Sequence, residues 1–112
     1  MTTVVRLSDH RRESRLVAFD RRELNALLSI YSQRVMRGEW RDYAIDQGPG
    51  MAMFAVFRNS ADRPAFTILK LAGASGKPGD YLVCSGRRTL RRAATLGEAL
   101  AVFERKLKLV SP

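Results

Sequence analysis

The stretch MAMFAVF, Met51–Phe57, is apolar at every position and has the length of one β-strand. Alternate side chains of a strand point to opposite faces of the sheet, so one face would carry Met51, Met53, Ala55 and Phe57 and the other Ala52, Phe54 and Val56. A face in water would carry polar residues at these positions. The stretch therefore predicts a strand within a sheet whose second face is also partly apolar.

Turn-forming residues lie on both sides of this stretch and divide the flanking sequence into further strand-sized segments. These segments are 42–45, 65–71, 81–85 and 89–93. The loops between them, such as QGPG at 47–50 and GASGKPGD at 73–80, are short and rich in Gly, Pro, Asn and Asp. Such loops suit the hairpins of an antiparallel meander.

A helix pattern stands at each end of this strand-rich region. Asp20 and Glu23 have the spacing of a capping box, which predicts a helix from about residue 21, and Gly38 is suited to end it. Thr95 and Glu98 repeat the box before a second helix. Apolar residues recur at helical spacing at Leu24, Leu27, Leu28, Tyr31 and Val35 and again at Leu96, Ala99, Leu100, Phe103 and Leu107.

Each helix has a single apolar stripe and must pack on another element. The pattern predicts an α+β fold: a four- or five-stranded, mainly antiparallel sheet with both helices on one face. Residues 1–14 are polar, basic and aperiodic, and we expect a flexible arm there and a single domain over 15–112.

Two helices on one face would leave the second face of the sheet partly apolar, and a patch of that kind usually marks an interface. We therefore expect a homodimer that buries the second face, with Phe54 and Val56 at the interface. The alternative is a sheet that curls strongly enough to cover that face itself.

The composition limits the classes of partner and location. The chain has 112 residues and a net charge of +9, and arginine supplies 16 of its 20 cationic side chains. Such a charge attracts nucleic acid, anionic lipid or an acidic partner, and arginine matches phosphate geometry; the competing explanation is codon bias. The longest apolar run is too short to cross a membrane and no signal-peptide pattern precedes it, so we expect a cytoplasmic protein without a membrane partner.

Few side chains are suited to catalysis. The only histidine, His10, lies in the predicted arm, and the only cysteine, Cys84, lies in an apolar segment. One His and one Cys cannot form a zinc site, and no nucleophile elbow is present. Gly76 and Lys77 resemble part of a phosphate-binding loop, but Pro78 stands where the magnesium ligand belongs. We expect no enzyme activity, no metal and no cofactor.

The stretch GEWRDYAID, 38–46, sets the only tryptophan, Trp40, among charged residues. Alternation places Asp42 and Asp46 on the strand face opposite Tyr43, and surface ion pairs with nearby arginines are a commoner role for such carboxylates than acid/base catalysis. A tryptophan just after a helix stop most often covers the end of a core. The alternative is a platform on which a base stacks.

The segment FDRRELNALLSIYSQRVMRGEW at 19–40, together with GEWRDYAID, MAMFAVFR and RPAFTILKL, resembles a small alphaproteobacterial family known only as domain of unknown function 2794. The likeness covers roughly Phe19 to Phe103. It implies a cytoplasmic bacterial protein with no assigned activity, and it transfers no catalytic residue.

Two arginine clusters complete the pattern, and they consist of Arg34, Arg37 and Arg41 around Trp40 and of Arg87, Arg88, Arg91 and Arg92 before the second helix. If residues 87–93 are extended, Arg88 and Arg92 share the side of Leu90, and the opposite side is basic as well. Such a segment suits an edge strand, where charges also block aggregation.

The functional alternative for these clusters is a phosphate-tracking groove, with Trp40, Tyr43 or Tyr81 as stacking platforms. Our first hypothesis is weak binding of single-stranded nucleic acid through the arginines. The alternative hypothesis is a homodimeric protein-interaction or regulatory module that does not bind nucleic acid.

Overall fold

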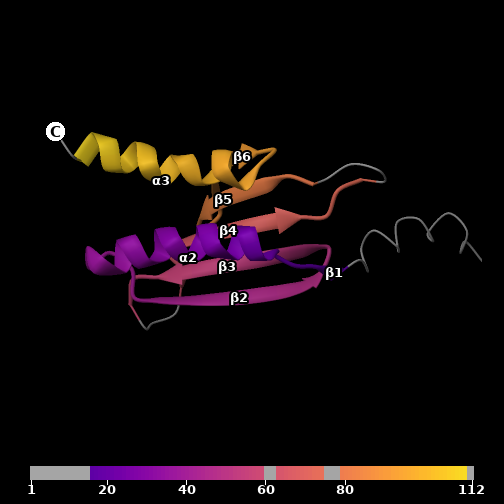
Figure 1. Cartoon of the computed structure of the whole chain (residues 1–112), viewed down its shortest axis with the longest axis horizontal. Coiled ribbons are helices and arrows are strands. Elements are labelled where there is room, and N and C mark those ends of the chain that lie inside the picture. Colours follow the sequence, from indigo (N-terminus) through magenta and orange to yellow (C-terminus); the bar gives the residue numbers. More distant parts are fainter. Residues whose placement is uncertain (1–15, 60–62, 75–78, 111–112) are drawn as a thin grey trace, which may run out of the picture.

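The computed structural model describes residues 16–59, 63–74 and 79–110, with the backbone alone for 105–110. The predicted arm therefore lies outside the described residues. The elements in chain order are β1 (Leu16–Val17), α2 (Arg21–Met36), β2 (Asp42–Pro49), β3 (Met51–Phe57), β4 (Phe66–Leu71), β5 (Tyr81–Ser85), β6 (Arg88–Ala93) and α3 (Leu96–Val110) (Figure 1).

The strands form one six-stranded antiparallel sheet in sequence order, which confirms the predicted α+β meander with more strands than expected. The extra strand is β1, which pairs with the end of β2. The predicted strand 42–45 is too short, because β2 continues through Pro49, where it pairs with β1. The chain still reverses at QGPG, since Gln47 pairs with Ala52 of β3, and Gly50 in this turn has a φ of 85°, a conformation that other residues rarely adopt.

Local chemistry fixes the ends of α2 as the sequence predicts. The Asp20 carboxylate accepts from the Glu23 amide, and the Glu23 carboxylate accepts from the Asp20 amide, both at 2.8 Å, so the capping box is complete. At the other end, Gly38 has a φ of 76° and its amide donates to Val35 O, which ends the helix.

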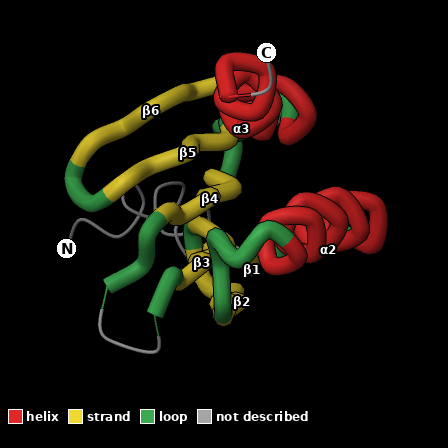
Figure 2. Tube along the Cα trace, turned by 90° about the vertical axis from the view of Figure 1, so that its left-hand side faces the viewer, coloured by secondary structure: helices red, strands yellow, loops and turns green. Residues whose placement is uncertain are grey.

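Both helices lie on the same face of the strongly twisted sheet, as predicted (Figure 2). The core between the layers contains Phe54, Ile68 and Val83 from the sheet together with Leu27 of α2 and Phe103 of α3, and all five are at most 1% exposed. This continuous core makes the described elements one packed unit.

The predicted orientation of Phe54 and Val56 was wrong. Both are 0% exposed beneath the helices, and the Phe54 ring lies 6.5 Å from the ring of Tyr31 in α2. Both alternating sets of β3 are apolar, so alternation could not tell which set the helices cover. The set that faces away from the helices is Met51, Met53, Ala55 and Phe57.

We call this side of the sheet the open face, because no helix of the described chain lies on it (Figure 2). Beside β3 it carries Leu69 of β4 and Leu82 of β5, both half-buried. The apolar second face predicted from the sequence is therefore present, with different residues on it.

Candidate polyanion-binding surface

The antiparallel order brings five chain segments to one end of the sheet. β2 begins there, since the Arg41 amide donates to Phe57 O at the end of β3. β4 begins there as well, since the Ala65 amide donates to Val56 O. The β5–β6 turn joins them through Ser85, whose hydroxyl donates to Ala65 O at 3.1 Å. The C-terminus of α2 leads directly into this end of β2.

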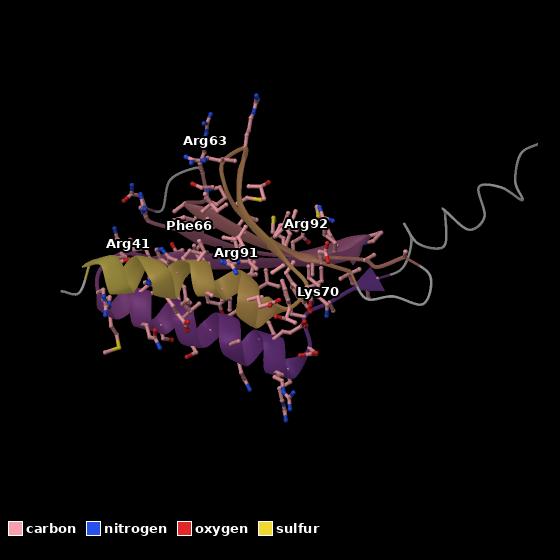
Figure 3. All side chains as sticks on the ribbon, turned by 90° about the horizontal axis from the view of Figure 1, so that it is seen from above. Arg41, Arg63, Phe66, Lys70, Arg91 and Arg92 are labelled. Atoms are coloured by element: carbon pink, nitrogen blue, oxygen red, sulfur yellow. The ribbon has the colours of Figure 1, made fainter. Side chains whose placement is uncertain are left out.

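Exposed arginines stand in each of these segments, and we call them the arginine row: Arg37, Arg41, Arg58, Arg63, Arg87 and Arg88. Figure 3 shows Arg41 and Arg63 on the same side of the molecule as Phe66, the first residue of β4. The guanidinium of Arg58 lies over the Phe66 ring at 5.7 Å from its centroid, which fixes one member of the row against the core.

Within the described chain, acidic side chains do little to neutralise the charge of the arginine row. None of its six side chains forms an ion pair with another described residue. Glu39 is bound to Arg34 instead, and Asp42 is exposed at the start of β2. The predicted pairing of Asp42 and Asp46 with nearby arginines is thus not among the ion pairs of the described residues.

Arg34 is not part of this surface, which corrects the sequence-based assignment. Only 4% of the residue is exposed. Its Nη1 donates to Glu39 Oε1 at 2.6 Å and its Nη2 donates to Phe103 O at 2.8 Å. The guanidinium also lies over the rings of Trp40 and Phe103, at 5.5 and 5.6 Å. Arg34 therefore joins α2 to α3 inside the protein and cannot reach a ligand.

Arg91 and Arg92 also lie away from the row. Arg91 pairs with Val83 on the helix side of β6, and Arg92 pairs with Leu82 on the open face, where its Nε donates to Asp80 at 2.7 Å. The register shifts between Val83 and Cys84, which makes Leu90 an extra, bulged residue. The prediction that Arg88 and Arg92 share a side was therefore wrong, although β6 is an edge strand as expected.

All three aromatic residues proposed as stacking platforms have partners within the protein. Trp40 is 2% exposed, and its ring packs against Phe66 and Phe103. Tyr81 is half-buried and donates its hydroxyl proton to Glu23. Tyr43 is 44% exposed at the start of β2 beside the arginine row, although its ring is stacked on Phe54 at 5.3 Å and makes a T-shaped contact with Tyr31 at 4.8 Å.

The structure also contains a partly buried polar network that was not predicted from the sequence. The Lys70 ammonium donates to Glu23 Oε1 at 2.7 Å and to Ala18 O at 2.8 Å, and the Tyr81 hydroxyl donates to Glu23 Oε2. Figure 3 shows Lys70 toward the end of the sheet opposite Arg41. The sequence FTILKL contains an indication of this network. Lys70 follows Phe66 and Ile68 in the alternating set of β4 that faces the core, where a charged side chain needs a partner.

The network perturbs two pKa values. Burial acts to raise the pKa of Glu23, but hydrogen bonds from Lys70, Tyr81 and the Asp20 amide, together with the Lys70 charge, outweigh it and lower that pKa. Burial and the hydrogen bond to Glu23 raise the pKa of Tyr81 well above its ordinary value. The network holds the start of α2 on β4 and β5.

We expect the lowered pKa of Glu23 to make its contribution to stability depend on pH. A carboxyl group that binds its proton less tightly when folded stabilises the protein above its unfolded pKa, and this stability is lost as pH falls below about 4.5. In urea titrations, Glu23→Gln should cost about 1–3 kcal/mol at pH 7, and the difference from wild type should shrink toward pH 3.5.

The matched control is Glu98→Gln. Glu98 occupies the same capping-box position in α3, but its only hydrogen-bond partner among the described residues is Thr95. We expect it to cost at most a few tenths of a kcal/mol at any pH, because Gln also serves in the box. Equal pH dependence in the two variants would contradict the role of Lys70 and Tyr81.

The described residues contain no group of three or more His, Cys, Asp or Glu side chains that could hold a metal ion. No helix among them is both long and apolar enough to cross a membrane. Asp42 and Asp46 point to the open face, in register with Phe57 and Met53, and both are exposed. The chemistry that the arrangement offers is attraction of anions at the arginine row.

Comparison with known proteins identifies one family. A family model described as a protein of unknown function, DUF2794, matches residues 17–100. Searches of the curated proteins and of the solved structures gave no match. The matched range includes α2, the strands β2 to β6 and the start of α3, so the arginine row lies entirely within it.

Proposed function

The chain belongs to the DUF2794 family, whose description gives no activity, and we propose that it binds single-stranded nucleic acid along the arginine row, weakly and with little sequence preference. The observation that carries the proposal is the gathering of six exposed arginines from five segments at one end of the sheet. Arginine forks bind phosphate oxygens through two parallel hydrogen bonds.

The shape of the row favours a flexible strand over a duplex. The arginines stand at the ends of strands, from the C-terminus of α2 to the β5–β6 turn, and the sheet that carries them is twisted (Figure 2). A duplex is stiff over about 150 base pairs and presents its phosphates along a nearly straight cylinder. A single strand can bend to follow the row.

Low sequence preference follows from the scarcity of groups that read bases. Phosphate contacts carry no sequence information, and Tyr43 is the one ring of the three candidates that remains accessible for stacking. The affinity should therefore come mainly from released counterions and should depend strongly on salt.

Titration of a labelled oligothymidylate at several salt concentrations tests the proposal. If all six arginines contact phosphates, log affinity should fall against log salt with a slope of about −4, at about 0.7 per contact. The double variant Arg87→Ala/Arg88→Ala should reduce that slope by about 1.4 and weaken binding to every sequence alike.

The chain offers a control with the same change in net charge. Arg21 and Arg22 are also adjacent and exposed, but they lie in the first turn of α2, away from the row. Arg21→Ala/Arg22→Ala should leave the slope unchanged. An equal loss in both double variants would mean that net charge alone attracts the oligonucleotide, and an absence of binding up to about 100 micromolar would exclude the proposal.

A further inference from the structure

The open face carries a row of side chains that runs across five strands. The register aligns Asp46 of β2, Met53 of β3, Leu69 of β4, Leu82 of β5 and Arg92 of β6. The row is therefore acidic at one end, apolar over its three central positions and basic at the other end. Asp46 and Arg92 are exposed, and the three apolar side chains are half-buried.

This row is complementary to itself. A two-fold axis parallel to the strands and passing by Leu69 would place Asp46 of one copy opposite Arg92 of a second copy, at both ends. The same rotation would place Met53 opposite Leu82 of the second copy and would bring the two Leu69 side chains together. An axis perpendicular to the strands, in the plane between the sheets, would instead oppose like charges, which costs free energy.

The neighbouring row permits close approach of two sheets. It consists of the small side chains Ala44, Ala55, Thr67, Cys84 and Thr89. The same rotation would bring Ala55 opposite Cys84 of the second copy. Small residues of the two copies then face each other, so the larger side chains of the first row make the contact at the usual spacing of about 10 Å between packed sheets.

The Arg92 side chain is held in a position from which it can contact a second copy on the open face. Its Nε is held by Asp80 at 2.7 Å, while its two terminal nitrogens have no hydrogen-bond partner among the described residues. The contact with Asp80 fixes the side chain beside the apolar row, and the terminal nitrogens remain available for a carboxylate such as Asp46.

We propose that a second copy of this chain binds the open face with its two-fold axis parallel to the strands, so that Asp46 and Arg92 pair between copies. Five strands about 4.8 Å apart and about six residues long span roughly 20 Å by 20 Å, or roughly 400 Å² of flat surface per copy. This is at the low end for specific interfaces. The dimer should therefore dissociate in the micromolar range.

The geometry of the dimer has a consequence for ligand binding that rests on the proposed function. A rotation about an axis parallel to the strands leaves corresponding ends of the two sheets at the same end of the dimer. The two arginine rows would therefore lie at one end, and twelve arginines would face one polyanion. The dimer itself needs no ligand, so it is tested without nucleic acid.

Sedimentation equilibrium from about 1 to 500 micromolar measures the dissociation constant of the full chain. Asp46→Arg places an arginine of one copy opposite an arginine of the other at both ends of the interface, and Arg92→Asp does the same with aspartates. Each substitution should therefore weaken the dimer at least tenfold through like-charge repulsion. The variant that carries both substitutions restores opposite charges and should return to within about threefold of wild type. Glu104→Arg and Arg22→Asp, which make the same charge changes on the helices, should have no effect.

A second measurement on the wild-type protein does not depend on these variants. Cys84 is the only cysteine and would lie within the interface, so its alkylation should slow several-fold as concentration rises through the dissociation constant. A monomer at all concentrations, assembly beyond a dimer, or a double variant without rescue would overturn the proposal. A dimer that leaves Cys84 equally reactive would also overturn it.

Discussion

Replacing Arg34 with alanine is expected to destabilise the protein by about 2–5 kcal/mol, because it removes a buried side chain that packs between two rings and donates two hydrogen bonds. The substitution removes the hydrogen bonds to Glu39 and to Phe103 O, and it leaves a cavity between the rings of Trp40 and Phe103. These contacts join α2 to α3, which are otherwise connected through the sheet. The loss should appear as a lower urea midpoint with an unchanged slope.

Three further variants separate charge from packing at this position. Arg34→Met keeps most of the side-chain volume and should cost less than alanine. Glu39→Gln should cost more than a surface substitution, because it leaves the buried guanidinium without its counter-charge. The control is Arg37→Ala, an exposed arginine three residues along the chain, which should change stability by less than about 0.5 kcal/mol.

Arg34→Ala also tests whether the Arg34 side chain takes part in oligonucleotide binding. A folded fraction of Arg34→Ala should show the salt dependence of wild type, because the side chain is enclosed between the helices. If Arg34→Ala kept the wild-type midpoint and lost oligonucleotide binding, the buried assignment would be wrong.

Local signals predicted the elements of the fold well. The capping box at Asp20 and Glu23, the stop at Gly38 and the second box at Thr95 place the helix ends that the structure shows. Strand order also followed, because short loops between apolar segments permit little except hairpins. What failed was a detail set by tertiary contacts: Pro49 stays in β2 because β1 pairs with it there.

The orientation of β3 could not come from its sequence alone. Both of its alternating sets are apolar, and the deciding contacts lie far along the chain, such as the Tyr31 ring against Phe54. Similarly, no local pattern distinguishes Arg34 from Arg37, although the first is buried and the second exposed. The difference depends on the position of α3, whose Phe103 carbonyl accepts from Arg34.

The arginine row could not be predicted from local sequence either. The clusters visible in the sequence consist of arginines that are neighbours in the chain, whereas the row combines Arg41, Arg58, Arg63 and Arg87 from separate segments. Strand register brings them to one end of the sheet, and a bulge at Leu90 moves Arg92 to another face. An accurate pairing of the strands was the information that the sequence lacked.

The tryptophan in GEWRDYAID gives the second large expected effect. Trp40→Ala should cost about 3–5 kcal/mol, since it removes a large buried side chain and leaves a cavity. The ring of Trp40 lies 5.4 Å from that of Phe103 and 6.1 Å from that of Phe66, so it closes the core between α3 and the sheet. At about 4–8 °C per kcal/mol, the melting temperature should fall by more than about 10 °C.

Far-UV circular dichroism should follow this melting, because the variant lacks the only tryptophan available for fluorescence. Tyr43→Ala is the matched comparison, since its ring is 44% exposed. A core role for Trp40 predicts lost stability with oligonucleotide affinity unchanged for the folded fraction, whereas a stacking platform would lose about 1–3 kcal/mol of binding with its stability intact. Since the ring is enclosed by Arg34, Phe66 and Phe103, a base could reach it only if the core opened.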